Sequence, residues 1–476
     1  MPQVTASTQI DPQGLPPAGS SRTAIARAAR LAGAALLAGC VTAQAQSLAE
    51  LHDAARGHDA GYQSARAQYE ANLAKAAQAR AGLLPSASLT ASASRTHTET
   101  TNSPETALNP REYGTQSAGI NLSQPLYRPA NLASYRQGEQ QSLLAEEQLK
   151  AAEQDLIVRV AQGYFDLLGA QDSLAFVRAQ KAAVAEQLAS ARRNFEVGTA
   201  TITDTREAQA RFDLVTAQEI AAENDLRVKQ LALDNLTGRT GTAPWPLKAG
   251  AALPGAAETG IEQWVASAEA DNPTVRQARI AHEVARLEVE KAKAGEKPTL
   301  DVVAGINRTL NHGNSSNPNA GISHVNGASI GVNFSLPLFA GFALQNRVKE
   351  TLMLEDKARA DLDNASRSVA QAARVAYLGV VSGLGQVKAY EAAEASSQSL
   401  LEASKLGYQV GVRVNLDVLN AQSQLFDTKA KLAKARHDLL VGGLKLRQAG
   451  GVLKGEDLQG VNALLRPAEV NPAAGN

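Results

Sequence analysis

Four stretches of the chain alternate between apolar and polar residues. In 86–94, Leu89 and three alanines alternate with serine and threonine, and in 117–126, Ile120 alternates in the same way with its neighbours. Two later stretches, around Val302 and Ile330, repeat the pattern. A period of two over roughly ten residues is typical of outer-membrane strands, which turn an apolar face to lipid and a polar face to a lumen. The pattern predicts strands at about 86–97, 115–127, 298–310 and 326–339.

Helical patterns fill most of the remaining chain. Apolar residues such as Leu174, Val177, Val184 and Leu188 recur every three or four positions, as coiled-coil packing requires. A segment from about 130 to 197 would extend about 100 Å as a helix. The shorter helical segments are about half as long, so that two of them, stacked end to end, would match one long helix. The long segments are 130–197 and 341–410, and the shorter ones are 47–82, 204–237, 264–295 and 416–449.

The chain is an internal repeat. Phe195-Glu196-Val197-Gly198 recurs 213 positions later as Tyr408-Gln409-Val410-Gly411, and prolines and glycines of the two halves match at nearly the same spacing. Glycines and prolines rarely match by chance between alanine-rich helices, so the spacing indicates a duplication. The expected organisation is a signal peptide, a first helix-hairpin-helix repeat, a linker, a second repeat and a C-terminal tail, at 1–45, 46–240, 241–262, 263–454 and 455–476.

Composition excludes several classes of protein. Lys plus Arg and Asp plus Glu balance at 47 each, so no global charge indicates binding to nucleic acid. The single cysteine, Cys40, excludes an intrachain disulfide framework and a CxxC metal site. Aromatic residues make up only 4 % of the chain, whereas alanine is abundant, which favours long, closely packed helices.

The N-terminus has the form of a secretory signal. Arginines precede an apolar run from Leu31 to Gly39, and Ala43-Gln44-Ala45 fits the small-residue cleavage rule, which predicts a mature start at Gln46. Leu37-Ala38-Gly39-Cys40 offers an alternative, a lipoprotein signal that would leave Cys40 acylated. Cleavage after Ala45 is favoured because the helical pattern begins directly afterwards, at Ser47.

The strands bear on how the chain could meet a membrane. No stretch after the signal approaches the ~20 apolar residues of a spanning helix, so a crossing would require a closed barrel. Four strands cannot close one, whereas two or three copies of the chain would supply eight or twelve. Aromatic residues stand near the ends of the strands, where interfacial side chains belong; they are Tyr113, Tyr127, Phe339 and Phe342. A soluble β-sandwich and a secreted coiled-coil scaffold are the structural alternatives.

One enzyme motif occurs. Gly327-Ala328-Ser329-Ile330-Gly331 matches the G-x-S-x-G nucleophile elbow, but that chemistry requires a tight turn from strand to helix, and Ser329 falls within an alternating strand. The chain has no HExxH pair and no Walker loop. We therefore expect no enzyme activity, no cofactor and no metal site, and energy for any transport would come from a partner.

Three motifs together resemble the TolC family of outer-membrane factors: Phe195 through Asp204, Ser335 through Phe339, and Gly407 through Leu419. The resemblance implies a homotrimer in outer-membrane lipid, with a shared twelve-stranded β-barrel and a periplasmic α-helical tunnel, in a Gram-negative bacterium. It implies docking onto a periplasmic adaptor and onto an ABC or proton-driven transporter of the inner membrane. The sequence is most similar to members that secrete a protein by a type I system, such as the RTX-type toxin cyclolysin. Small-molecule efflux is the alternative cargo class.

The resemblance also implies a periplasmic gate at the two glycine turns. Asp204 with Tyr408, and Thr203 with Arg413, would form constricting links, and Asp417 would line the narrowest part of the pore. Asn420 stands where the family often has a second acid, so a trimer would carry three carboxylates there instead of six. From the residues alone, Asp204 could equally cap a helix, with Glu207 at capping-box spacing, and Asp417 could favour a helix N-terminus.

Overall fold

The computed structural model describes residues 46–99, 111–248, 250–251, 260–313, 319 and 321–466. The expected signal peptide with Cys40, and the end of the C-terminal tail, lie outside the described residues. The helices are α2 Leu48–His58, α3 Ala60–Ala81, α4 Pro129–Glu196, α5 Ile202–Thr237, α6 Ile261–Asp271, α7 Pro273–Ala294, α8 Ala343–Gln409, α9 Asn415–Ala449 and α10 Asp457–Asn462. The strands are β1 Ser86–Thr98, β2 Arg111–Tyr127, β3 Thr299–His312 and β4 Ser323–Ser335.

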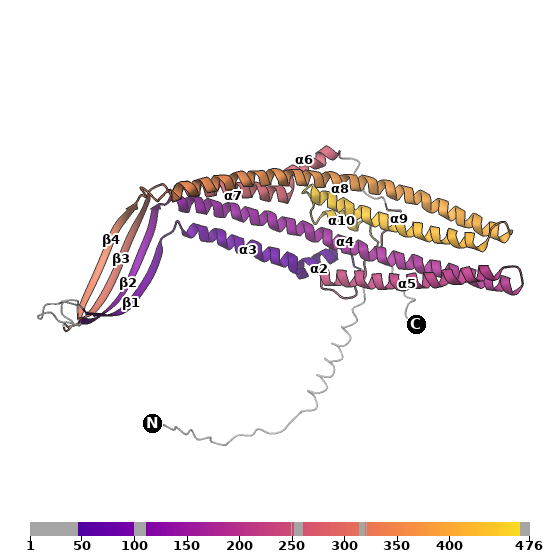
Figure 1. The fold of residues 1–476 in the computed structure, drawn as a ribbon, viewed down its shortest axis with the longest axis horizontal. Coiled ribbons are helices and arrows are strands. Elements are labelled where there is room, and N and C mark those ends of the chain that lie inside the picture. Colours follow the sequence, from indigo (N-terminus) through magenta and orange to yellow (C-terminus); the bar gives the residue numbers. More distant parts are fainter. Residues whose placement is uncertain are drawn as a thin grey trace, which may run out of the picture. The chain divides into compact units, whose positions relative to one another are not determined.

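The same order of elements occurs twice. Each half consists of two short helices, two strands, one long helix and one helix of intermediate length. Figure 1 shows the long helices α4 and α8 running beside the shorter ones. Helices α4 and α8 contain 68 and 67 residues, which corresponds to about 100 Å each. α4 begins with Pro129, whose missing N–H costs nothing in a first helical turn.

Each expected N-terminal helix of a half is broken in two. The segments expected at 47–82 and 264–295 each contain a break, at Asp59 and at Asn272, which stand 213 positions apart. The Asp59 carboxylate accepts a hydrogen bond from the Tyr62 amide at 2.7 Å, and the Asn272 amide oxygen accepts one from the Thr274 amide at 2.9 Å. These residues end one helix and cap the next, because their short polar side chains satisfy the free amides of a first turn.

Asp59 has a second role that Asn272 cannot share. Its carboxylate receives two hydrogen bonds from the Arg159 guanidinium in α4, at 2.9 and 3.0 Å. These bonds hold the pKa of Asp59 below its ordinary value. The ion pair fastens the break between α2 and α3 to the long helix.

We expect Asp59→Asn to lower the free energy of unfolding by about 1–2 kcal/mol, because it removes the ion pair with Arg159. The asparagine should keep the helix cap, as Asn272 does in the second half. Since the folded-state pKa is depressed, the ion pair contributes fully above pH 3.8 and is lost as the pH falls through the lowered pKa. Thermal melting in detergent should therefore separate the variant from wild type near pH 7, and the difference should shrink as the pH falls below 3.8. A difference that persists unchanged at low pH would contradict the ion-pair explanation.

The four strands form one antiparallel sheet in the order β1-β2-β3-β4. Ser86 pairs with Ser123 across β1 and β2, and Thr299 pairs with Ser335 across β3 and β4. β4 ends at Ser335, before the expected end at 339, because Pro337 has no N–H to donate to a ladder. The sheet leaves its apolar side chains uncovered: Leu89 is 76 % and Ile330 is 82 % exposed in the single chain.

The main core lies where the linker and the C-terminal segment meet α4. Tyr164 is fully buried there, and its hydroxyl donates to the Trp245 carbonyl at 3.0 Å. Gln46 forms a bridge with Pro244, and Leu247 forms one with Leu465. The linker and the chain end therefore pack together beside α2 and α4.

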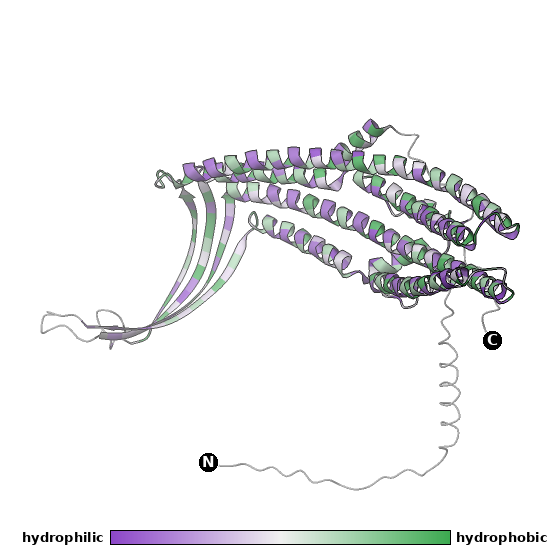
Figure 2. Cartoon of the chain, turned by 45° about the vertical axis from the view of Figure 1, so that its right-hand side comes forward, coloured by the Kyte–Doolittle hydropathy of each residue, from purple (hydrophilic) through white to green (hydrophobic). Residues whose placement is uncertain are grey.

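Apolar residues are not confined to the interior of the helical region. Figure 2 shows apolar and polar residues mixed around the long helices. On α8, Met353, Val375 and Leu406 are each more than 60 % exposed in the single chain. A helix that is apolar on more than one side needs neighbours on more than one side.

Candidate functional site

The two long helical hairpins, α4–α5 and α8–α9, end in the same backbone turn, at the right-hand ends in Figure 1. Gly198 and Gly411 both have a φ of 77°, a left-handed conformation that glycine adopts without a Cβ clash. In each turn, the amide after the glycine donates to the carbonyl four positions before that glycine, at 2.8 Å. The duplicated motifs of the sequence therefore correspond to duplicated turns.

The first hairpin end carries a complete capping box. The Asp204 amide donates to the Thr201 hydroxyl at 3.2 Å, and the Asp204 carboxylate accepts from the Thr201 amide at 2.9 Å. The capping alternative placed Asp204 at the start of the helix with Glu207 as its partner, and this was wrong by one turn. α5 begins at Ile202, so Thr201 is the cap and Asp204 is its third-position partner.

The second hairpin end carries half of such a box. Val414 stands at the equivalent cap position and has no polar side-chain atom, so only the Asp417 carboxylate acts, accepting from the Val414 amide at 3.4 Å. Arg413 Nη1 lies 3.6 Å from the same carboxylate oxygen. A Cβ at Gly407 would lie 2.7 Å from Cγ of Arg413, so this glycine leaves the room that the arginine occupies.

Tyr408 connects the two hairpins. Its hydroxyl accepts a hydrogen bond from the Asn194 side-chain amide at 3.3 Å, which joins α8 to the end of α4. The Tyr408 ring packs on a small apolar cluster that includes Leu401 and Val418. The sequence did not single out Asn194, because nothing in its local pattern distinguishes it from a solvated helical residue.

Within the described part of one chain, neither expected link is present. Asp204 bonds to Thr201 and not to Tyr408, and Arg413 lies beside Asp417 and not beside Thr203, which is exposed. The four expected gate residues therefore lie at the same pair of hairpin ends. Asp204, Tyr408 and Arg413 contact residues other than the partners expected for them.

A polar seam joins α9 to the first hairpin above the turns. Arg211 in α5 donates to the Asn420 amide oxygen at 2.7 Å. Gln187 in α4 donates to Asn415, and Gln180 donates to Ser423 at 3.1 Å. Asn420, expected at the pore constriction, is thus held by an arginine. These contacts had one signal in the sequence: amide residues recur at helical spacing among the apolar residues of the packed helices.

A pair of titratable groups lies further along the same helices, with the imidazole of His437 buried and the carboxyl of Asp172 partly exposed. His437 Nε2 lies 3.7 Å from Asp172 Oδ2, and the imidazole ring packs at a tilt of 32° against the ring of Phe165. Burial lowers the pKa of His437 to about 4. Near neutral pH the imidazole is therefore uncharged and acts as a packing group.

The structure bears on the enzyme alternative as well. Ser329 lies inside strand β4, paired with Gly305, and not on a turn from strand to helix. Among the described residues, no group of three or more His, Cys, Asp or Glu side chains could hold a metal ion. No helix in the described part of the chain is long and apolar enough to cross a membrane.

The family model described as "Outer membrane efflux protein" matches residues 51–239 and again 264–452. The chain belongs to this family of outer-membrane efflux and secretion channels, the TolC family. Its members are channel proteins and not enzymes, so the family assigns no reaction to Ser329. Family membership places the protein in the outer membrane of a Gram-negative bacterium, with an extension into the periplasm.

Individual relatives agree with the family. The outer membrane protein TolC of Vibrio cholerae is 36 % identical, over 85 % of this chain and 91 % of its own length. The alkaline protease secretion protein AprF of Pseudomonas aeruginosa is 32 % identical, over 84 % of each chain. Protein CyaE of Bordetella pertussis is 24 % identical over 67 % of this chain. Its similarity, which the sequence analysis expected to be the highest, is therefore lower than that of TolC and AprF.

The fold has solved counterparts. The crystal structure of the outer membrane protein VceC from Vibrio cholerae superimposes with a TM-score of 0.71, at 20 % identity, over 85 % of this chain and 96 % of that one. At this identity the likeness concerns the fold. It supports the arrangement of the chain as two helix-hairpin-helix halves.

Proposed function

We propose that the protein is the outer-membrane channel of a tripartite export system, and that its cargo is a protein delivered by type I secretion. The observation that carries this choice is the 32 % identity to AprF, named for the secretion of alkaline protease, over 84 % of both chains. The family resemblance of the sequence implies the same cargo class, an exported protein such as an RTX-type toxin. A periplasmic adaptor and an inner-membrane ABC transporter would be the partners.

Three copies would assemble the channel. The sheet has four strands, with β1 and β4 at its edges, and too few strands to close alone. Edge-to-edge pairing of three sheets would give one barrel of twelve strands and would pair both edges of every sheet. The exposed apolar residues of α8 support the same arrangement, because neighbouring copies would cover them.

The hairpin ends would form the periplasmic gate. Thr203, Asp204, Tyr408 and Arg413 lie at the two turns of one chain, and in a trimer these turns would approach those of neighbouring copies. Asp417 would line the narrowest point, and Arg413 beside it would reduce the net negative charge of the ring. Asn420 and its partner Arg211 would add a second layer without carboxylates.

The protein should purify as a detergent-dependent trimer and form water-filled pores in planar lipid bilayers. The physical reason is that unpaired edges and exposed apolar faces are satisfied only in the closed assembly. Cross-linking with size analysis and single-channel recording give the two readouts on one preparation. A monodisperse monomer without conductance would overturn the channel.

We expect Asp417→Asn to lower the preference of the pore for cations several-fold without widening it. Three carboxylates around an axis attract cations, and the substitution removes their charge while keeping the size of the side chain. Asp427→Asn is the matched control, since Asp427 also lies in α9 and is paired with Lys431. Reversal potentials in a salt gradient measure the preference, and equal values for both variants would remove Asp417 from the constriction.

Small-molecule efflux is the second candidate function, favoured by the description of the matched family. The two candidates differ in the transporter of the inner membrane. Cross-linking in cells, followed by identification of the captured transporter, distinguishes them. An ABC transporter encoded with a secreted protein supports secretion, and a proton-driven pump supports efflux.

A further inference from the structure

One face of the sheet is apolar for most of its length and then becomes charged. Because cross-strand partners point to the same side, the register assigns Leu89, Ile120 and Ile306 to a single row across three strands. The next row outward, toward the 99–111 connection, contains Ala91, Ala118, Arg308 and Asn326. The apolar band therefore ends at Arg308.

The position of Arg308 fits the outer boundary of a membrane. Eight residues separate it from Leu300, which begins the same face of β3, so it lies roughly 27 Å along the strand. Strands of a membrane barrel are tilted by about 35–45°, so this length corresponds to a height of about 20 Å. An apolar band of a membrane barrel is about 25 Å tall, and a cationic residue costs little near its edge compared with its centre. In the proposed barrel, Arg308 would therefore lie within about 5 Å of the outer edge of the band, close to the lipid headgroups.

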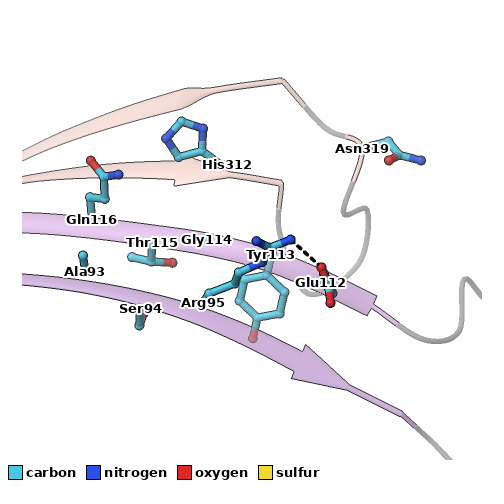
Figure 3. Close-up of a pocket in the computed structure, with 10 residues that line it drawn as sticks. All are labelled: Ala93, Ser94, Arg95, Glu112, Tyr113, Gly114, Thr115, Gln116, His312 and Asn319. Carbon is cyan, nitrogen blue, oxygen red and sulfur yellow. Dashed lines mark hydrogen bonds and ion pairs between the residues drawn. The ribbon is translucent and has the colours of Figure 1, made fainter. Parts of the chain in front are cut away.

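Arg308 is exposed and has no ion-pair partner among the described residues. The neighbouring charges on this face are already matched. Arg95 Nη2 donates to Glu112 at 2.7 Å, and His97 lies 3.3 Å from the other oxygen of the same carboxylate. Figure 3 shows Arg95 and Glu112 joined across their strands, with His312 on the next strand. Of the two arginines that the register assigns to the described part of this face, Arg308 is the one that no described carboxylate pairs.

The surface beside Arg308 is hollowed on two sides. A groove of about 520 Å³ runs inward and is lined by Leu89, Ile120, Ile306 and Ala328, and a second of about 480 Å³ lies beside it over Ala91 and Ala93. Arg308 and Ala118 line both grooves. The small alanine side chains leave room next to the guanidinium, and the apolar groove of Leu89, Ile120 and Ile306 extends away from it.

We propose that Arg308 binds the phosphate of a phosphorylated membrane lipid, whose acyl chain lies in the groove of Leu89, Ile120 and Ile306. A planar guanidinium forms bidentate hydrogen bonds with phosphate oxygens, and Asn326 beside it supplies an additional amide donor. The inference rests on the proposed function, because the apolar face must meet lipid. It assigns each copy one anionic-lipid site in the outer leaflet.

The test uses the full-length protein in detergent, with phosphatidic acid as the probe and diacylglycerol as the same lipid without phosphate. Native mass spectrometry measures retention of each lipid by wild type, Arg308→Gln and the control Arg367→Gln, which removes an equal charge from α8. We expect Arg308→Gln to weaken retention of phosphatidic acid about tenfold and the control to leave it unchanged. Diacylglycerol should bind all three proteins weakly and equally.

Pore formation in phosphatidylcholine bilayers accompanies each measurement. Equal retention of phosphatidic acid by Arg308→Gln and wild type, with normal pores, would overturn the lipid site and leave the channel standing. Displacement of the lipid by inorganic phosphate at equal concentration would show a site for the free ion and would also overturn it. Failure of wild type to form pores would instead overturn the proposed function.

Discussion

Replacing Tyr408 by phenylalanine and Arg413 by serine in one chain is expected to raise single-channel conductance several-fold. The first change removes the hydroxyl that accepts from Asn194, and the second removes the guanidinium beside Asp417. Each polar contact contributes on the order of 0.5–1.5 kcal/mol, and a trimer multiplies the number of contacts by three. Because both contacts lie at the hairpin ends, their loss should loosen the tunnel entrance and spare the assembly.

The competing explanation is that these residues only stabilise helix ends. Thr201→Val provides the matched control, because it breaks the capping box of α5 while leaving Tyr408 and Arg413 in place. Loss of such a cap costs about 1 kcal/mol. The control should lower the melting temperature without altering conductance, and the double variant should do the reverse. Unchanged conductance in the double variant would discard the gate.

Ile330→Arg is expected to prevent most of the protein from assembling in a bilayer. Ile330 is 82 % exposed in the middle of the apolar sheet face, opposite Ala304. A cationic side chain at the centre of the lipid face of a membrane barrel costs about 2–4 kcal/mol, and every copy would carry it. Folding into phosphatidylcholine vesicles, followed by unfolding in urea, measures the loss.

The adjacent position supplies the control. Ser329 points to the opposite, polar face, where it pairs with Gly305, so Ser329→Arg should assemble normally. It should also reduce cation conductance, because its charge would face the lumen. Equal damage from both substitutions would show that the two faces of the sheet do not meet different solvents.

The sequence predicted the regular elements well, and the reason lies in their periodicity. Alternation over residues 86–94 requires one face to differ from the other, and the observed β1 begins at Ser86. The breaks at Asp59 and Asn272 were missed, although Asn272-Pro273 is a turn signal in its own right. Both interrupt helical patterns that continue on either side.

The contacts of the site could not be predicted in the same way. Whether Arg211 meets Asn420 depends on how α5 and α9 are rotated against each other, and those residues are 209 positions apart. The cap at Thr201 was within reach, because Thr201 and Asp204 have the spacing of a capping box. The resemblance to the family drew attention to Asp204 and away from its local partner.

The unequal caps of the two hairpins bear on the symmetry of the assembly. Duplication followed by trimer formation would place six hairpins with the same turn around one axis, a pseudo-sixfold ring. Thr201 caps one hairpin with a side-chain hydrogen bond, and Val414 leaves the other without one. The hairpins of the ring would therefore form two alternating sets, one with a complete cap and one with a partial cap. In that assembly the backbone of the ring would be sixfold and its helix caps threefold, so opening would begin at every second hairpin, the one that carries Asp417.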